Sequence, residues 1–380
     1  MNQKKVKQYI IKALDCLNTY RYGKEFRRIM EVNKLKNVKA EGEEDWVKKW
    51  SVLGKPDRCY YRLYTNYIGP DINIVPQNLS HNIVELLLCP YRFAGYYADK
   101  NSFDKLFPQG YFPKTVLRKM QGCFFDENYS RVILNDDWLS ERLKTVNTDY
   151  VMLKPSIDGM SGIGVQKFVK NDEGGYINVK SGQLLTSEYL LNAVGDNIII
   201  QEGFLQHSYL NQFCKTSINT IRLTLYRSVK DEQCHVTSAI MRMGRDGSVV
   251  DNLGQGGSYI GIHKDTGILD KSVRDHDARI KTIHNGIDFA ANHFQLPHWT
   301  EILEFAKSVG QYVPHHRLLA LDVVLDTDGN PSMLEFNIEG YNPSLFQFTL
   351  SSAWGDFTDE IIEYCSEKLK SRERVLYLNQ

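Results

Sequence analysis

The sequence has no excess of charge of either sign: among its 380 residues, Lys and Arg number 46, and so do Asp and Glu. A protein whose main task is to bind nucleic acid needs a positive excess, so the composition argues against that class. No apolar run reaches the ~18 residues of a membrane span. The best candidate, residues 83–97, is interrupted by Glu85, Pro90 and Arg92. The N-terminal lysines precede no apolar segment, which argues against a signal peptide.

Cysteine is scarce and scattered, with seven residues and no C-x-x-C pair. A disulfide scaffold or a zinc site is therefore not expected, and the pattern predicts a protein of the reducing cytoplasm. Several motifs of nucleotide and hydrolase chemistry are also missing. There is no G-x-x-x-x-G-K-[ST], no G-x-G-x-x-G after a strand, no H-E-x-x-H and no G-x-S-x-G. Walker NTPases, Rossmann dehydrogenases, zincins and α/β-hydrolases are thereby disfavoured.

The first distinct feature is an N-terminal segment that is basic and has helical periodicity. Residues 1–50 hold 13 Lys/Arg against 7 Asp/Glu, and Val6, Ile10, Leu14 and Leu17 recur at helical spacing. This pattern predicts an amphipathic helix that either packs on the body of the protein or contacts an anionic surface or partner. Residues 51–97 are rich in aromatics, which we interpret as core. Residues 1–97 are therefore expected to form a mostly helical, aromatic-rich extension.

From residue 98 the pattern predicts a mixed α+β protein, in which strands alternate with helices and Gly-rich turns. The expected strands are Tyr150–Lys154, Gly164–Val169, Asn197–Gln201, Thr220–Arg227, His235–Arg242, Leu319–Leu325 and Ser332–Asn337. A turn at residues 326–331 predicts that the last two form a hairpin. The expected helices are Asp275–His293, Thr300–Tyr312 and Phe357–Lys370.

The first candidate for chemistry is a strand that ends on Lys154 and runs into a loop rich in Gly and Ser. The backbone N–H groups of such a loop can bind phosphate oxygens, and the lysine adds a positive charge. A plain hairpin with a surface lysine explains the pattern equally well. A second stretch, Gln201-Glu202-Gly203-Phe204, ends an apolar strand and could pair its backbone with an adenine edge, although an ordinary strand end also fits.

The remaining candidates for chemistry are two arginines and a group of two acids and an asparagine. Arg222 and Arg242 lie in successive strands and suit phosphate or carboxylate if both point inward, whereas each alone suits a surface ion pair. Asp322 lies in an apolar strand, and Glu335 and Asn337 share one face of the next. Isolated buried carboxylates are costly, so a cation is expected, and hard oxygen donors suit Mg²⁺. On this view, removing one carboxylate relieves repulsion and leaves stability unchanged or higher.

In this order the features resemble the ATP-grasp superfamily and, within it, the sugar-transfer-associated ATP-grasp family. The resemblance rests on Ser217-Ile-Asn219-Thr220-Ile-Arg222, the Asp322 strand, Glu335-Phe-Asn337 and Gln347, and it covers roughly residues 98–365. It implies an α+β fold of two lobes that hold ATP between them. The expected divisions are an extension at 1–97, a linker and N-lobe with a phosphate-covering loop at 98–204, and a C-lobe with the magnesium site at 205–380.

The resemblance also implies roles, position by position. Lys100 resembles the first ATP lysine, with Lys105 and Lys114 as nearby competitors, and Lys154 resembles the second. The remaining nucleotide contacts implied are Ser156, Gly159, Ser161 and Gly162 in the loop, and Gln201, Glu202 and Phe204 at the adenine hinge. Arg222, Arg242 and Asn252 resemble the catalytic and substrate-site residues, and Asp322, Glu335 and Asn337 the magnesium ligands. One departure is that no acid follows the hinge to bind ribose; His207 or Asn211 stands there instead.

The implied activity is that of an ATP- and Mg²⁺-dependent carboxylate–amine ligase that forms an amide through an acyl phosphate. The family's setting implies amino-acid decoration of a surface-polysaccharide precursor, with a sugar or sugar nucleotide among the small-molecule substrates. A kinase of the same fold that phosphorylates a hydroxyl of a sugar-like molecule is the alternative, and a non-enzymatic ATP-binding module is disfavoured by the intact acids and Lys154. The protein is expected to be cytoplasmic, without nucleic-acid partners, and to form a homodimer.

Overall fold

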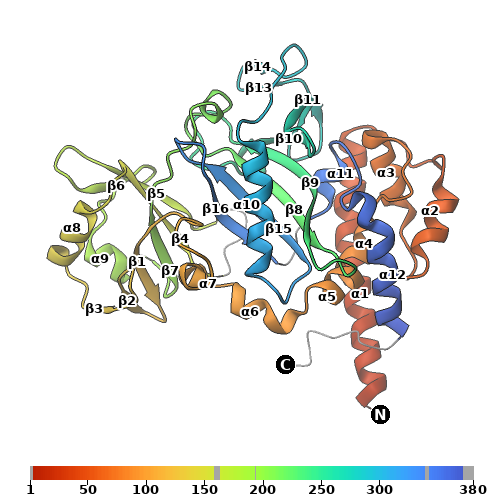
Figure 1. The fold of residues 1–380 in the computed structure, drawn as a ribbon, viewed down its shortest axis with the longest axis horizontal. Coiled ribbons are helices and arrows are strands. Elements are labelled where there is room, and N and C mark those ends of the chain that lie inside the picture. Colours follow the sequence, from red (N-terminus) through yellow and green to blue (C-terminus); the bar gives the residue numbers. More distant parts are fainter. Residues whose placement is uncertain (1–2, 158–162, 193, 339–341, 371–380) are drawn as a thin grey trace.

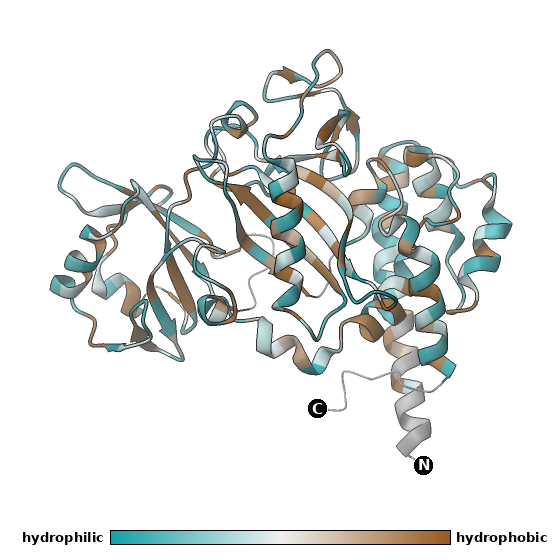
Figure 2. Cartoon of the chain, viewed as in Figure 1, coloured by the Kyte–Doolittle hydropathy of each residue, from teal (hydrophilic) through white to brown (hydrophobic). Residues whose placement is uncertain are grey.

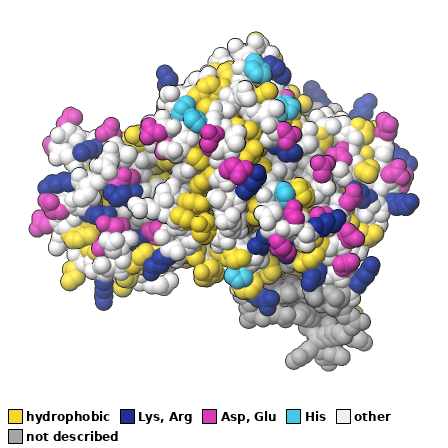
Figure 3. Space-filling model, viewed as in Figure 1, with side chains coloured by type: hydrophobic (Ala, Val, Ile, Leu, Met, Phe, Trp, Pro, Cys, Tyr) yellow, Lys and Arg dark blue, Asp and Glu magenta, His cyan; other side chains and the backbone are white. Residues whose placement is uncertain are grey.

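The computed structural model describes residues 3–157, 163–192, 194–338 and 342–370. Along the longest axis of the molecule lie a small lobe, a central sheet and a group of helices formed by the N-terminal residues (Figure 1). Apolar residues concentrate in the strands, whereas the outer helices are largely polar (Figure 2). Basic and acidic side chains are intermixed on the visible face, in keeping with the zero net charge (Figure 3).

Among the described residues of 1–97, every regular element is a helix or a helical turn. These are α1 (Gln3–Val32), α2 (Glu43–Trp50), α3 (Arg58–Ile68), α4 (Gln77–Leu79), the π-helical turn η1 (Ser80–Val84), α5 (Glu85–Leu88), η2 (Tyr91–Phe93) and α6 (Ala94–Tyr97). The aromatic residues form their core, with Trp46, Trp50 and Tyr64 fully buried. The expected helix near the start is present, but Leu14 and Leu17 are exposed on it, and its later turns make the packing contacts instead.

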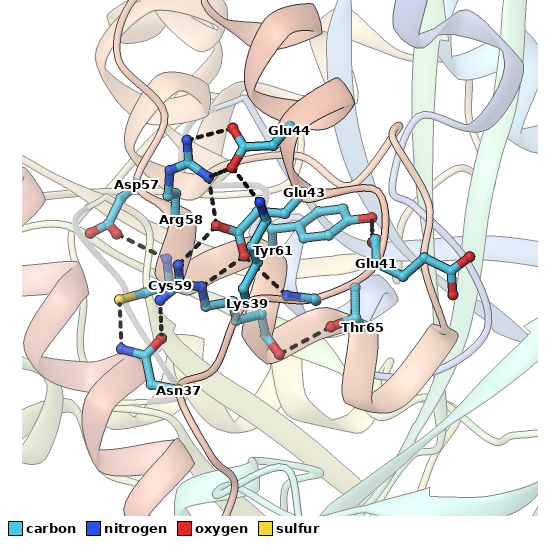
Figure 4. A network of polar contacts seen from close by, with 12 residues as sticks. Asn37, Lys39, Glu41, Glu43, Glu44, Asp57, Arg58, Cys59, Tyr61 and Thr65 are labelled. Atoms are coloured by element: carbon cyan, nitrogen blue, oxygen red, sulfur yellow. Dashed lines mark hydrogen bonds and ion pairs between the residues drawn. The ribbon is translucent and has the colours of Figure 1, made fainter.

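A buried carboxylate ties the second and third helices together (Figure 4). Glu43 accepts hydrogen bonds from Arg58 Nη1 at 2.7 Å and from Arg62 Nε and Nη2, each at 2.8 Å. Hydrogen bonding to Arg62 is the main cause that lowers the pKa of Glu43 to about 2, with burial opposing it. The backbone N–H of Ala40 adds a further bond to the same carboxylate. Charge pairing, and not apolar burial alone, therefore connects these helices.

The small lobe is a seven-stranded antiparallel sheet in the order β3-β2-β1-β7-β4-β5-β6. Two short helical turns lead into it, η3 (Lys100–Ser102) and α7 (Phe103–Leu106). Its strands are β1 (Thr115–Met120), β2 (Cys123–Phe125), β3 (Arg131–Val132), β4 (Tyr150–Pro155), β5 (Gln166–Lys170), β6 (Tyr176–Asn178) and β7 (Ile198–Glu202). Helices α8 (Asp136–Lys144) and α9 (Ser187–Asn192) share the apolar core of this sheet.

The central sheet is also seven-stranded and antiparallel, in the order β12-β11-β10-β9-β8-β15-β16. Its strands are β8 (Thr220–Arg227), β9 (Cys234–Met243), β10 (Ser258–His263), β11 (Ile268–Arg274), β12 (Ile280–Lys281), β15 (Leu318–Leu325) and β16 (Pro331–Asn337). Short turns η4 (Leu210–Gln212) and η5 (Leu253–Gln255) precede β8 and β10, and α11 (Ser344–Gln347), η6 (Gly355–Phe357) and α12 (Thr358–Lys370) follow β16.

The two faces of this sheet have different neighbours. On one face, Leu223, Met241 and Leu321 belong to the apolar core that includes residues of α10 (Trp299–Gln311). On the other face, Tyr226 and Ala320 pack into the core of the N-terminal helices. Alternation along β8 and β15 puts Arg222 and Asp322 on this second face, beyond the apolar part that the helices cover. One sheet face is thus apolar at one end and charged at the other.

Most predicted elements are present, including the hairpin of β15 and β16, but the helix predicted over Asp275–His293 is wrong. This segment contains β12 and the two-stranded hairpin of β13 (Ile283–His284) and β14 (Ile287–Asp288). Asn285 and Gly286 form its turn with φ of 47° and 78°. An Asn-Gly pair between short apolar stretches is a strong hairpin signal, which the helical periodicity obscured. Among the described residues, no helix is long and apolar enough to cross a membrane.

Candidate functional site

A cavity of about 1650 Å³ is lined by the small lobe, the central sheet and the N-terminal helices. The small lobe contributes residues of β4 and β7, and the central sheet contributes residues of β8, β9, β15 and β16. Of the predicted site residues, those that line it are Lys100, Lys154, Gln201, Glu202, Phe204, Arg222, Arg242, Asn252, Asp322, Glu335 and Asn337. The fold therefore gathers at one cavity residues that are up to 237 positions apart, from Lys100 to Asn337.

Three charged side chains form a row across neighbouring strands. Arg222 on β8 is the register partner of Asp322 on β15, which is in turn the register partner of Glu335 on β16. Arg222 donates to Asp322 through Nε at 2.8 Å and through Nη2 at 2.9 Å, a bidentate pair. Glu335 pairs with Lys100 Nζ at 2.9 Å. The charges of the row are therefore balanced within the protein.

A second arginine joins the same group. Arg242 Nη2 lies 3.1 Å from Asp322 Oδ2, and its Nε donates to Thr220 Oγ1 at 2.9 Å. Asp251 lies 3.3 Å from Arg242 Nε and accepts a hydrogen bond from the Thr220 hydroxyl. Burial lowers the pKa of Arg242, but Asp251 and Asp322 outweigh it and the net direction is upward. For Asp322, burial raises the pKa, but the charges of Arg222 and Arg242 lower it by more. The net shift is downward, so this carboxylate stays ionised.

This arrangement corrects the expectation that Asp322 and Glu335 lack partners without a metal. Arginine neutralises Asp322 and lysine neutralises Glu335. Removing the Asp322 carboxylate would leave Arg222 without its acid and Arg242 with Asp251 alone, so a loss of stability is now expected.

The predicted metal set fits magnesium in its donor chemistry. Asp322, Glu335 and Asn337 offer two carboxylates and an amide oxygen at the cavity, which are hard donors. Asn337 Nδ2 is buried and has no hydrogen-bond partner among the described residues; this N–H donor would suit a phosphate oxygen, whereas a metal ion would take the amide oxygen. No group of three or more His, Cys, Asp or Glu in the described part of the chain could hold a metal ion. A magnesium ion here would therefore need further oxygens from a bound phosphate.

Two lysines approach this row from the small lobe. Lys154 is at the end of β4, and Lys100 is held beside it because its backbone N–H donates to Ser156 O at 2.9 Å. Burial is the main cause that lowers the pKa of Lys154 to about 8, with the charge of Lys100 adding to it and Glu335 opposing it. Of the competitors, Lys114 pairs with Glu202 at 3.0 Å and Lys105 lies over the Tyr129 ring, so Lys100 is the one nearest the acids.

The loop after β4 is only partly described. Ser156 is fully buried, its Oγ has no hydrogen-bond partner among the described residues, and its N–H donates to Asn197 O at 3.1 Å. Gly159, Ser161 and Gly162 lie outside the described residues. Ser156 is not among the residues that line the cavity.

The predicted hinge lies at the end of β7. Gln201 donates through Nε2 to Pro113 O at 3.0 Å, and Tyr150 donates its hydroxyl to Phe204 O. A register shift after Asp322 leaves Leu334 as an extra residue in β16. Because of this bulge, Leu334 lines the cavity together with its neighbour Glu335. The hinge and Leu334 thus bound a partly apolar compartment next to the lysines.

The segment after the hinge is ordered by a buried amide pair. Gln206 Oε1 accepts from Asn219 N at 2.9 Å and from Asn219 Nδ2 at 3.1 Å. Asn219 Nδ2 also donates to the carbonyls of Leu210 and Cys214 at 2.8 and 3.0 Å. The Asn of the Ser217–Arg222 motif is therefore structural. Of the two candidates for the ribose position, Asn211 lines the cavity and His207 does not.

Asn252 caps the turn that leads to β10. Its Oδ1 accepts from Gly254 N at 2.9 Å, and Gly256 follows with φ of 90°. A Cβ on Gly257 would lie 2.9 Å from three backbone carbonyl oxygens, so only glycine allows this close approach. The Gly-Gly pair thus folds the segment so that Asn252 faces the cavity.

Local patterns do not predict three features of the site, although the sequence marks Asp251 as a possible base for a kinase and Thr220 as part of the Ser217–Arg222 motif. Lys167 on β5 lines the cavity, and burial lowers its pKa. Thr220 and Asp251 complete the hydrogen bonds of Arg242. The N-terminal helices supply a wall that includes Tyr22 and Glu85. For Lys167, the position on a strand after the Gly-rich loop was the one local signal of a site residue. The pairing of Arg242 and the wall of N-terminal helices depend on contacts between distant segments, which local patterns do not show.

Comparison with known proteins identifies the family. The model of the sugar-transfer associated ATP-grasp family matches residues 98–353. The chain belongs to this family. The ATP-grasp fold predicted for the part beyond the extension is thereby confirmed. No curated protein matches the sequence.

Solved structures with some similarity to this chain include several ligases and synthetases. VanG D-Ala:D-Ser ligase from Enterococcus faecalis is 13% identical with a TM-score of 0.40, over 74% of this chain and 62% of that one. D-cycloserine synthetase DcsG is 16% identical with a TM-score of 0.37, over 74% and 73%. The chain spans 50% of the length of purK, an N5-carboxyaminoimidazole ribonucleotide synthetase, at 12% identity and a TM-score of 0.36.

Proposed function

We propose that this protein is an ATP-dependent carboxylate–amine ligase that forms an amide through an acyl phosphate. The observation that carries the proposal is the cavity in which Lys100 and Lys154 from one lobe meet Arg222, Asp322 and Glu335 from the other. Phosphoryl transfer depends mainly on positioning and on neutralising the charge of the phosphate oxygens. The family membership of the chain supports the use of ATP.

Each part of the cavity has a role in the proposed reaction. The hinge at Gln201–Phe204 and Leu334 would hold the adenine, and Lys100 and Lys154 would bind phosphate oxygens. Lys100 would exchange its pairing with Glu335 for a phosphate. Asp322, Glu335 and Asn337 would hold Mg²⁺, which, when bound, supplies positive charge to the phosphate oxygens.

The two arginines would act on the transferred group. Arg222 and Arg242 would donate to the carboxylate substrate and to its phosphorylated form, in which negative charge must be neutralised. The carboxylate oxygen attacks the γ-phosphorus, the bond to the β-phosphate oxygen breaks, and ADP leaves. The amine nitrogen then attacks the acyl carbon, inorganic phosphate departs, and the nitrogen loses a proton to give the amide. Asn252 would position the substrate.

One observation favours a second candidate, a kinase that phosphorylates a hydroxyl. Asp251 lines the cavity, and a carboxylate there could accept the proton of a hydroxyl substrate. Its pairing with Arg242 and Thr220 occupies this carboxylate in the described state, which favours the ligase.

Hydroxylamine separates the two reactions, since it attacks an acyl phosphate to give a hydroxamate but leaves a phosphate ester intact. The full chain would be incubated with ATP, Mg²⁺, hydroxylamine and a panel of amino acids and uronic acids, and hydroxamate detected by mass. We expect wild type to form a hydroxamate. Arg222→Lys keeps the charge but not the bidentate guanidinium donors, so the rate of hydroxamate formation should fall about 100-fold or more. The control Arg279→Lys, at an exposed arginine outside the cavity, should form hydroxamate at the rate of wild type. A stable phosphorylated product without hydroxamate would establish the kinase.

The setting proposed for this ligase is the decoration of a surface-polysaccharide precursor with an amino acid. What supports it is the description of the family as sugar-transfer associated. A panel that contains amino acids, uronic acids and amino sugars tests this choice of substrates directly.

A further inference from the structure

The wall that the N-terminal helices add to the cavity differs in charge from the rest. The lobes contribute a net excess of two positive charges to the lining, from six basic side chains, Lys100, Lys154, Lys167, Lys215, Arg222 and Arg242, and four acidic ones, Glu202, Asp251, Asp322 and Glu335. Among the described residues of 1–97 that line the cavity there is no Lys or Arg, and Glu85 is the one acidic side chain. A phosphate or carboxylate is therefore favoured on the lobe side, and a neutral or cationic group on the side of the N-terminal helices.

This wall is held in place by a continuous chain of hydrogen bonds that starts in the core. Tyr64 donates to Ser344 Oγ at 2.8 Å, and Ser344 donates to Gln77 Oε1 at 3.0 Å. Gln77 Nε2 lies 2.6 Å from His81 Nε2, and His81 Nδ1 lies 3.0 Å from Glu85 Oε1. Since an amide nitrogen can only donate, His81 accepts at Nε2 and carries its proton at Nδ1, toward Glu85. Glu85 Oε1 also accepts from Ser80 Oγ at 3.0 Å, and Glu85 lines the cavity.

An aromatic surface and two amides complete the wall. The rings of Tyr22 and His81 are stacked with centroids 4.4 Å apart and an angle of 5° between planes. Asn18 Nδ2 donates to Asn82 Oδ1 at 3.1 Å, and both residues line the cavity. A flat ring stack next to amides and a carboxylate suits a ligand with an apolar ring face, hydroxyl groups and an amino group.

We propose that the wall of Tyr22, His81 and Glu85 is the amine subsite, and that its ligand is a hydroxylated primary amine of the amino-sugar class. This inference rests on the proposed ligase function, because it places the amine in the cavity that the arginines, which would hold the acyl phosphate, also line. Glu85 binds the ammonium form as it enters, and the ring face packs on Tyr22. The N-terminal helices thereby complete a site that the two lobes leave open on one side.

Direct binding tests the subsite without turnover, with D-glucosamine as the probe and the full chain preloaded with ADP and Mg²⁺. By calorimetry we expect D-glucosamine to bind wild type and D-glucose, which has a hydroxyl in place of the amine, to bind about tenfold more weakly. Glu85→Gln, which keeps acceptors for its neighbours, should weaken binding of D-glucosamine about tenfold. Tyr22→Leu should weaken it several-fold, and Tyr22→Phe should restore it, as expected for ring stacking.

A matched control is available on the same helix. Tyr20 is 66% exposed and does not line the cavity, so Tyr20→Leu should bind D-glucosamine as wild type does. Thermal unfolding of every variant checks that it is folded. The subsite is refuted if wild type does not bind D-glucosamine. It is also refuted if Glu85→Gln and Tyr22→Leu both bind D-glucosamine with the affinity of wild type. The hydroxylamine assay tests the ligase independently, so a positive hydroxamate with no effect of these variants refutes only the amine subsite.

Discussion

Arg222 and Asp322 face each other across two antiparallel strands and are joined by two hydrogen bonds of 2.8 and 2.9 Å. The pair lies where the apolar face of the central sheet gives way to the cavity. Its geometry explains why a carboxylate can remain ionised in an otherwise apolar strand: a planar guanidinium matches both carboxylate oxygens. The same pair holds Arg222 in one orientation before any substrate arrives, which reduces the reorganisation required for catalysis.

Asp322→Asn should both abolish turnover and destabilise the protein. Loss of the carboxylate leaves Arg222 without its acid and Arg242 with Asp251 alone, and breaking one side of a buried pair costs about 3 kcal/mol. Urea unfolding followed by circular dichroism would measure the stability, and ADP release the turnover. Glu335→Gln is the comparison: its carboxylate is about one-third exposed and, among the described residues, forms an ion pair with Lys100 alone, so we expect lost activity with little change in stability. Higher stability in Asp322→Asn would contradict the pairing.

Nucleotide affinity should fall as the pH rises through about 8. This is the pKa of Lys154, which burial and the charge of Lys100 lower from its ordinary value. The neutral amine cannot neutralise a phosphate, so the Kd for ADP should rise by up to about tenfold per pH unit above this pKa. Lys154→Arg should remove this limb of the profile, because arginine stays charged. A flat profile in wild type would contradict the assignment.

The lowered pKa of Lys154 has the opposite consequence for folding stability, which should increase with pH. Between pH 8 and 10.5 the unfolded chain holds a proton on Lys154 that the folded chain has lost. The contribution of this residue to stability therefore increases with pH over that window. Comparison of wild type with Lys154→Met in denaturant titrations at pH 7.5 and 9.5 would measure it.

Glu43→Gln should destabilise the N-terminal helices, since Arg58 and Arg62 both donate to this buried carboxylate. Because the folded pKa is about 2, against an ordinary 4.5, the stability from this group is present above pH 4.5 and lost as the pH falls toward 2. We expect a loss of about 2 kcal/mol at pH 7, below the full linkage value because water reaches the arginines. Glu44→Gln is the control: Glu44 also binds Arg58 but is exposed, and should unfold as wild type does.

Asn219→Ala should destabilise the segment that borders the nucleotide compartment. The substitution removes three hydrogen bonds, to the buried carbonyls of Leu210 and Cys214 and to Gln206 Oε1, and at about 1 kcal/mol for each bond the loss is about 2 kcal/mol or more. Amide hydrogen exchange should increase over residues 206–219. Asn292→Ala, at an exposed asparagine that donates one bond to Asp288 O, is the control and should leave exchange there unchanged.

The strands and most of the site residues were predictable from local patterns. Apolar alternation identified the strands that carry Arg222, Asp322 and Glu335, and the two-residue spacing of Glu335 and Asn337 implied a shared face. Periodicity failed at Asp275–His293, where Asn285-Gly286 forms a hairpin turn. In that segment turn chemistry outweighs helical spacing, because a backbone with positive φ at two successive residues cannot continue a helix.

Tertiary structure alone decided how the charges are paired and what closes the cavity. Which lysine meets Glu335 depends on how the turn at Lys100 packs on Ser156, and which acid meets Arg242 depends on the loop that brings Asp251 to Thr220. The wall of Tyr22, His81 and Glu85 comes from helices whose residues precede the family's region and have no local mark of a site. Residue type and spacing determine strands and faces, because these follow from backbone geometry. Ion pairing and cavity walls follow from contacts between distant segments, which no local pattern encodes.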